Sequence, residues 1–302
     1  MTSHHGDKPG ENDLASWVET TIREFCHSSP DNDMHYADHE PLTDEPIIGF
    51  SAGDDRLYEF FKQDIGFPYM TPRELFQSAF PDDQADSGDL TVISWILPLT
   101  KHTRDSYKQE TLFAVSERWA RAKHYGGIFN IALMKHLVEK LGNQGIRAMA
   151  PTFPPVWKRG VSEKYSIASS WSERHAAYVS GLGTFGLCEG LITKKGKAVR
   201  CGSILAKVTI PPTPRPYMDH HAWCLYFARG TCKLCIKRCP VEAITEQGHD
   251  KNRCEGYSFG VAQEYVRSQY HIDNYGCGLC QVGVPCESKN PVRSKIGDRI
   301  TK

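Results

Sequence analysis

Apolar residues along the first hundred positions follow helical spacing in some segments and strand spacing in others. Five of them recur at helical spacing behind Asn12 and Asp13, which can cap a helix, and they predict an amphipathic helix. They are Leu14, Trp17, Val18, Ile22 and Phe25. Short apolar runs predict buried strands at 47–51 and 91–97, and a second helix is expected to begin at Leu57.

The middle of the chain continues this mixture. Residues 116–141 have helical spacing, although Gly126 and Gly127 are expected to break or kink the helix. Its apolar face would contain Ile131, Met134, Val138 and Leu141. After a strand at 146–150, an irregular stretch is predicted over 154–169, and such stretches often line active sites.

Helix and strand signals then alternate up to a proline-rich segment. Ser170 and Glu173 fit a capping box, which predicts a helix that ends at Gly181. Strands are expected at 191–193 and 203–210. The prolines that follow predict a stiff linker, and we therefore expect two folded units.

Composition limits the possible partners. The 302 residues include 36 basic and 36 acidic side chains, so the formal charge is zero and no general field attracts a polyanion. A mean hydropathy of −0.46 leaves too little apolar material for a membrane span. The first dozen residues are polar and hold no apolar signal core, so we expect a cytoplasmic protein.

Eight of the 11 cysteines gather between positions 224 and 286, which indicates metal binding rather than disulfides. The core is the run Cys232-x2-Cys235-x3-Cys239-Pro240, most of a bacterial ferredoxin motif, in which the cysteine before proline typically binds a second cluster. The others are Cys224, Cys254, Cys277, Cys280 and Cys286. Eight thiolates suffice for two [4Fe-4S] clusters with four ligands each.

The crossed arrangement of such motifs provides a hypothesis for the pairing. One cluster would use Cys224, Cys232, Cys235 and Cys286. The other would use Cys239, Cys254, Cys277 and Cys280. An unbroken motif would have its first cysteine at Arg229, so Cys224 has to reach the cluster through a longer loop. Two zinc sites are the alternative, because CxxC repeats also form zinc ribbons, but the spacing before Cys-Pro favours clusters.

Residues 181–186, Gly-Leu-Gly-Thr-Phe-Gly, match the G-x-G-x-x-G pattern of dinucleotide-binding folds. That pattern must follow a strand and open a helix, whereas a predicted helix precedes it here. We therefore favour a helix-terminating turn that approaches a ligand, with a purely structural turn as the alternative.

Three stretches of the chain resemble the family that includes epoxyqueuosine reductases and corrinoid-dependent reductive dehalogenases. The first runs from Ser172-Glu173-Arg174 through the glycine loop to Arg200, and the second is the eight-cysteine segment. The third combines 46–55 with 119–125.

The resemblance implies an α/β (α+β) fold with two domains. Residues 1–215 would form a nitroreductase-like, corrinoid-binding domain, in which 1–45 are an N-terminal helix and linker. Residues 216–302 would form a small bacterial-ferredoxin-like domain that holds two [4Fe-4S] clusters.

The resemblance also implies a base-off cobalamin, bound without a protein histidine beside the clusters. The expected cofactor-binding residues are Tyr125, Gly181, Leu182, Gly183, Gly186 and Arg200. In the epoxyqueuosine enzymes an aspartate six residues before the Glu-Arg pair is taken as proton donor, but Ile167 occupies that position here. Tyrosine donors occur in the dehalogenase branch, so Tyr165 is the candidate general acid, with a packed aromatic as the alternative.

The function implied is an iron-sulfur oxidoreductase that passes single electrons from two clusters to cobalamin and reductively cleaves a small-molecule substrate. The alternative is a non-catalytic, low-potential electron carrier or a reactivator of a corrinoid protein. Ferredoxin or flavodoxin is the expected electron donor. Because the sequence ends soon after Cys286, without the helical repeats that epoxyqueuosine enzymes use on tRNA, we expect neither tRNA nor a membrane as partner.

Overall fold

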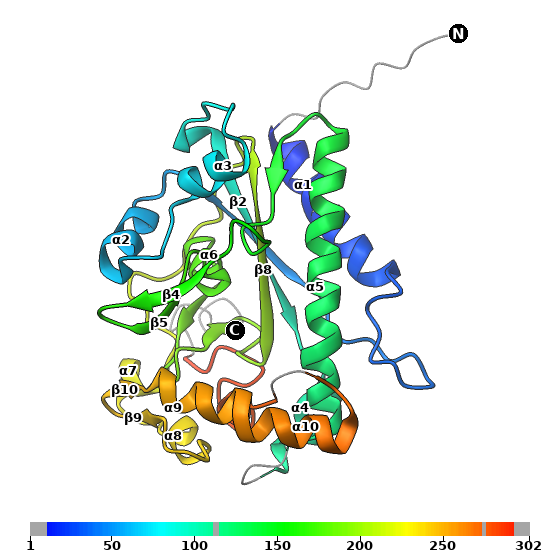
Figure 1. The fold of residues 1–302 in the computed structure, drawn as a ribbon, viewed down its shortest axis with the longest axis vertical. Coiled ribbons are helices and arrows are strands. Elements are labelled where there is room, and N and C mark those ends of the chain that lie inside the picture. The colour runs from blue at the N-terminus through cyan, green and yellow to red at the C-terminus, as the bar shows by residue number, and fades with distance from the viewer. Residues whose placement is uncertain (1–10, 111–114, 274–275, 293–302) are drawn as a thin grey trace, which may run out of the picture.

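A four-stranded antiparallel sheet forms the centre of the computed structural model, which describes residues 11–110, 115–273 and 276–292 (Figure 1). The strands, in the order in which they pair, are β1 (Ile47–Ala52), β2 (Leu90–Pro98), β8 (Val199–Lys207) and β3 (Ala148–Met149). Every residue of β2 is buried. This pattern is typical of a central strand whose two faces are both covered by helices.

Two helices pack on one face of the sheet (Figure 1). They are α1 (Glu11–Ser28) and α5 (Glu117–Asn143). The side chain of Ser116 caps α5 by accepting a hydrogen bond from the backbone N–H of Trp119. Phe129 and Leu133 of α5 are fully buried against the sheet, in the same core as Ile22 of α1.

Two details predicted for α5 are wrong. The helix continues through Gly126 and Gly127 without a break, and the guanidinium of Arg200 lies beside both glycines. Ile131 is 45% exposed rather than part of the buried face. Met134 and Leu141 are buried as predicted, and the buried stripe also contains Trp119, Ala122, Phe129, Leu133 and Leu137.

Shorter elements cover the other face and the ends of the sheet (Figure 1). The helices are α2 (Arg56–Ile65), α3 (Pro72–Ala79) and α6 (Glu173–Val179), with the 3-10 turn η1 (Ser87–Asp89) before β2 and α4 (Lys101–Lys108) after it. Two hairpins join them, β4 (Arg159–Ser162) with β5 (Ser166–Ser169), and β6 (Gly183–Phe185) with β7 (Leu191–Thr193). The first hairpin replaces the irregular stretch expected over 154–169.

The cysteine-rich segment lies across the end of the sheet (Figure 1). It contains α7 (Leu225–Arg229), α8 (Leu234–Lys237), β9 (Ile244–Thr245), β10 (Gly248–His249), α9 (Lys251–Gly256), the π-helical turn η2 (Tyr257–Val261), α10 (Ala262–Tyr270) and the 3-10 turn η3 (Leu279–Gln281). Val266 and Leu279 join the core on the α5 side, whereas Trp223 and Ile244 join the core on the α6 side. The segment thus packs on both cores.

The α/β (α+β) class predicted from the sequence is confirmed. The domain boundary at 215/216 stays a prediction. No helix among the described residues combines the length and the apolar character needed to cross a bilayer. The cytoplasmic location also stays a prediction, and residues 1–10, on which it partly rests, lie outside the described residues.

Substituting Gly278 with alanine tests how the cysteine-rich segment docks on α5. A β-carbon at Gly278 would overlap the indole of Trp119, which is fully buried. We expect Gly278→Ala to lower the free energy of unfolding by about 1–3 kcal/mol, measured by denaturant titration under anaerobic conditions. Gly142→Ala is the control, since nothing lies within 4 Å of that position in α5 and alanine should stabilise the helix by up to about 1 kcal/mol. Equal effects of the two substitutions would contradict this packing.

Candidate iron-sulfur centre and adjoining site

The first predicted set of cysteines lines one small cavity. Cys224 caps the start of α7, Cys235 lies in α8, and Cys232 and Cys286 come from the loops beside them. The longer loop before Cys232 therefore does bring Cys224 to the other three. Gly186 and Lys197 of the α/β region also line this cavity, so it lies where the two parts of the chain meet.

The second predicted set is also gathered, around the starts of α9 and η3. Burial, together with the nearby Cys254 and Cys239, raises the pKa of the Cys277 thiol to about 11. Cys280 lies close enough to Cys277 for the two sulfurs to affect each other's charge. The backbone N–H of Ala243 donates a hydrogen bond to Cys239 Sγ at 3.2 Å, a contact that tunes thiolate ligands in iron-sulfur proteins.

The spacing of the cysteines favours iron-sulfur clusters over zinc, because the run Cys232-x2-Cys235-x3-Cys239-Pro240 is a ferredoxin feature. A zinc ribbon would hold four donors around one ion. In a cubane each of four thiolates binds a different iron, and each predicted set supplies four cysteines. The assignment of each cysteine to a cluster stays a prediction.

The segment that contains Cys286 is fixed to the α/β region by backbone contacts. The N–H of Lys197 donates to the carbonyl of Cys286 at 2.8 Å. Gly196 has a φ of +82°, and a β-carbon there would overlap the carbonyl of Glu287. A glycine is therefore required where these two chain segments approach.

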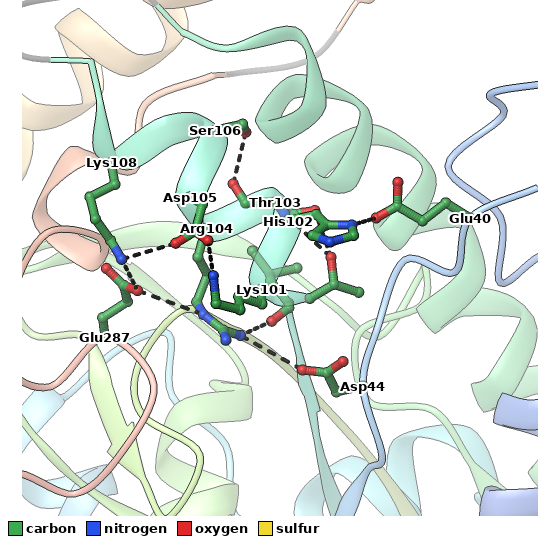
Figure 2. Close-up of polar contacts among 12 residues, drawn as sticks. Glu40, Asp44, Lys101, His102, Thr103, Arg104, Asp105, Ser106, Lys108 and Glu287 are labelled. Atoms are coloured by element: carbon green, nitrogen blue, oxygen red, sulfur yellow. Dashed lines mark hydrogen bonds and ion pairs between the residues drawn. The ribbon is translucent and has the colours of Figure 1, made fainter. Parts of the chain in front are cut away.

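Figure 2 shows how the carboxylate of Glu287 anchors the same segment. It forms ion pairs with Lys108 at 3.0 Å and with Arg104 at 3.7 Å, both from α4. It also accepts a hydrogen bond from the N–H of Gly283 at 2.6 Å, which closes the loop that leads to Cys286. Arg104 in turn lies 3.7 Å from the carboxylate of Asp44. These contacts position a cysteine whose spacing departs from the usual motif.

The glycine loop is packed against protein for most of its length. Gly181 ends α6 with a φ of +76°, and a β-carbon there would lie 2.8 Å from the carbonyl oxygen of Pro214. A β-carbon at Gly183 would overlap the carbonyl oxygen of Ile192 across the β6–β7 hairpin, and Leu182 is 4% exposed. Only Gly186 reaches the cysteine-lined cavity. Cofactor binding by these four residues stays a prediction.

The two other predicted cofactor residues lie on the α5 side of the sheet. The ring of Tyr125 packs on His35 with centroids 4.0 Å apart. Arg200, at the start of β8, donates from Nη2 to the carbonyl of Lys123 at 2.6 Å. Both side chains are half-buried. Their contact with a corrinoid stays a prediction.

The candidate acid Tyr165 lies at the tip of the β4–β5 hairpin and has an acidic partner that the sequence did not reveal. Its hydroxyl donates to Asp64 Oδ2 at 2.6 Å, and Asp64 also pairs with Lys164. Burial and the Asp64 carboxylate raise the pKa of Tyr165, so the phenol keeps its proton. Burial opposes ionisation of Asp64, but Lys164 and Tyr165 outweigh it and lower the pKa of that carboxyl.

A chain of polar contacts connects this hairpin with a cluster ligand. Lys251, at the start of α9, lies 5.3 Å from the ring centroid of Tyr165 and 3.9 Å from Glu189. Glu189 pairs with His249 at 3.3 Å. Burial opposes protonation of His249, but Cys254 and Glu189 outweigh it and raise its pKa to about 10. The candidate acid is thus adjacent to the helix that carries Cys254.

Glu173 is a buried carboxyl group that was not singled out as a site residue. Burial raises its pKa from 4.5 to about 8. Its Oε2 accepts a hydrogen bond from Ser203, whose oxygen in turn accepts from the indole N–H of Trp171 at 3.0 Å. Its Oε1 is buried without a partner. An unpaired buried oxygen is costly unless a ligand or water contacts it.

The fold of this chain resembles that of solved epoxyqueuosine reductases and reductive dehalogenases. The structure resembles an epoxyqueuosine reductase from Bacillus subtilis whose catalytic loop is swung out of the active site, with a TM-score of 0.52 and 15% identity over 94% of this chain and 68% of that chain. It also resembles a reductive dehalogenase described as B12-dependent, with a TM-score of 0.55 and 10% identity over 92% of this chain and 32% of that chain. At these identities the likeness shows the fold.

The curated relatives that the chain matches are also named epoxyqueuosine reductases. An epoxyqueuosine reductase of Atelocyanobacterium thalassa is 26% identical over 210 residues, which are 66% of this chain and 60% of the relative. One from Aliivibrio fischeri is 32% identical over 120 residues, 37% of this chain and 30% of the relative. The chain therefore matches about three fifths or less of these relatives' length. No family model matches the chain. The resemblance predicted from the sequence is confirmed.

The expectation that tRNA is no partner is wrong. The curated relatives are epoxyqueuosine reductases, and one structure with the same fold is an epoxyqueuosine reductase with an epoxyqueuosine-modified tRNA stem loop, at a TM-score of 0.50. Net charge was a poor guide because it averages over the whole surface, whereas a nucleic acid contacts only one patch.

Replacing Glu287 with glutamine tests the anchor of Cys286. The amide keeps the shape but loses both ion pairs, so we expect a loss of about 1–3 kcal/mol in stability and faster release of iron to a chelator. Glu246→Gln is the matched control, because that carboxylate forms an exposed, solvent-screened ion pair with Lys233 and its loss should leave stability nearly unchanged. Iron release at the same rate in the two variants would count against the anchor.

Replacing Glu173 with glutamine tests the buried acid. Between pH 5 and 8 the unfolded chain ionises this carboxyl while the folded chain keeps its proton, so wild-type stability falls as the pH rises. Glutamine cannot ionise, and we expect the variant to lose on the order of 2 kcal/mol less than the wild type over this interval. Denaturant titrations at several pH values provide the measurement, and parallel stability curves would exclude a neutral Glu173.

Proposed function

We propose that this protein is an iron-sulfur oxidoreductase in which two [4Fe-4S] clusters pass single electrons to a base-off cobalamin for the reductive cleavage of a bound substrate. The observation that carries the proposal is the pair of cysteine sets beside an α/β region with the fold of corrinoid-type reductases. A simple electron carrier would need only the cysteine-rich segment, whereas this segment shares both hydrophobic cores with the α/β region.

Several residues would hold the corrinoid. Tyr125, Arg200 and Gly186 are the predicted contacts that are not packed wholly against protein. The unpartnered Oε1 of Glu173 offers a hydrogen-bonding partner for an amide, and corrinoids carry several amide side chains. These groups fit such a ligand. A bound corrinoid would supply a strongly reducing cobalt centre, and the protein supplies orientation and protons.

The proton required by reductive cleavage would come from Tyr165. Its hydroxyl holds a proton at neutral pH because burial and Asp64 raise its pKa. Lys164 and Lys251 lie at 4.9 and 5.3 Å from the centroid of its ring and would stabilise the phenolate left after transfer. Asp64 orients the hydroxyl through the 2.6 Å hydrogen bond. The missing aspartate of the epoxyqueuosine enzymes is thus replaced by a tyrosine that is paired with an acid.

The relatives suggest which substrate to test first. They are named epoxyqueuosine reductases, so a tRNA stem loop that carries epoxyqueuosine is the leading candidate. Because the chain matches only part of those proteins, its own substrate is inferred and a small organohalide is the second candidate. The non-catalytic alternative, a carrier or corrinoid reactivator, predicts electron transfer without turnover of either.

The test uses the anaerobically purified full chain with titanium(III) citrate as reductant. Cobalamin is titrated and followed in the visible spectrum, and the reduced complex is then mixed with each substrate. Binding of one cobalamin and consumption of a substrate support the proposal. Failure to bind cobalamin would overturn it, and cobalamin reduction with no turnover would favour the carrier.

Substituting Tyr165 with phenylalanine tests the proton donor. We expect kcat to fall by about 10²–10⁴-fold while cobalamin binding and iron content stay unchanged, because only the transferred proton is lost. Tyr226→Phe is a matched control, since that hydroxyl also contacts a carboxylate, Glu246, but lies on the surface of the cysteine-rich segment. A Tyr165→Phe variant with wild-type kcat would assign this ring to packing.

A further inference from the structure

Lys197 is a buried cation that is neither a predicted cluster ligand nor part of the proposed proton donor. It follows the sharp turn at Gly196 and is 3% exposed. Its ammonium group donates to Cys188 Sγ at 3.1 Å. Among the described residues it forms no ion pair with a carboxylate.

A buried ammonium group without a counter-charge costs several kcal/mol, so an anion is expected to face it. The negative charges that act on Lys197 are those of four cysteines, Cys188, Cys235, Cys280 and Cys286. Lys197 also lines the cavity that contains the first predicted set of ligands. The anion that this geometry suits is therefore a thiolate-bound cluster rather than a carboxylate.

Cys188 places the lysine between the two predicted clusters. It is buried, and its sulfur lies against Cys235 of the first set and Cys280 of the second. It is not needed as a ligand, because the eight other cysteines already provide four for each cluster. The two remaining cysteines behave differently, since burial is the largest influence on Cys26 and Cys201 and raises the pKa of each thiol to about 12.

We propose that Lys197, held by Cys188, is a positioning residue that raises the reduction potentials of the clusters, most strongly that of the cluster bound by Cys224, Cys232, Cys235 and Cys286. This inference rests on the proposed function, because it requires the clusters. Reduction adds one electron and no proton to a cluster. The reduced form is therefore more negative, and a nearby cation stabilises it more than it stabilises the oxidised form. A higher potential at this cluster would direct electrons toward it from the other.

The test is a potentiometric titration of the full chain, followed by electron paramagnetic resonance, with iron and labile sulfide measured on each sample. In Lys197→Met we expect at least a tenfold drop in the ratio of reduced to oxidised cluster at the wild-type midpoint potential, which is a shift of about 59 mV to more negative values. Lys197→Arg keeps the charge and should restore the wild-type midpoint. Lys194→Met, at an exposed position in the same turn, is the control and should leave the midpoint unchanged.

The outcomes separate this inference from the proposed function. Unchanged midpoints in a Lys197→Met variant that holds its full iron and sulfide would overturn the role of Lys197 alone. If the wild-type chain holds no labile sulfide, both fail together. Should the methionine variant not fold, Lys197→Gln removes the same charge, and a midpoint equal to that of the wild type in this variant would also overturn the proposal.

Discussion

Cysteine sulfurs that must ionise to bind metal repel one another, and they stay together only if a cationic centre offsets that repulsion. In this protein they come from loops and short helices between positions 224 and 286, which have few long elements of their own. The α/β region helps to hold these cysteines in place. Gly196 allows the Cys286 segment to approach, Glu287 ties it to α4, and Lys197 adds a buried positive charge.

The need to hold the cysteines together ties the cysteine-rich segment closely to the α/β region. Each cysteine set touches residues from the α/β region, Lys197 and Gly186 for the first set and Tyr107 for the second. The helix that carries Cys254 also contacts the β4–β5 hairpin through Lys251. The cysteines proposed to deliver electrons and the tyrosine proposed to deliver the proton therefore lie on neighbouring elements. A substrate between them would be close to both.

Local patterns predicted most of the fold and supplied the hypothesis for the metal ligands, because periodicity and CxxC spacing are encoded within short segments. The helices at α1 and α5 and the strands β1 and β2 lie where their apolar patterns placed them. The partner of Tyr165 could not be found this way, since Asp64 is 101 residues away and the contact exists only after folding. Lys197 gave no signal for the same reason. Glu173 did have one, because it is part of the motif that carries the family resemblance.

We infer that the cysteines hold two cubanes. Iron, acid-labile sulfide and zinc should be determined in the full chain after anaerobic purification and reconstitution. With two cubanes we expect about eight iron and about eight sulfide per chain, with zinc absent. Stoichiometric zinc without labile sulfide would contradict it.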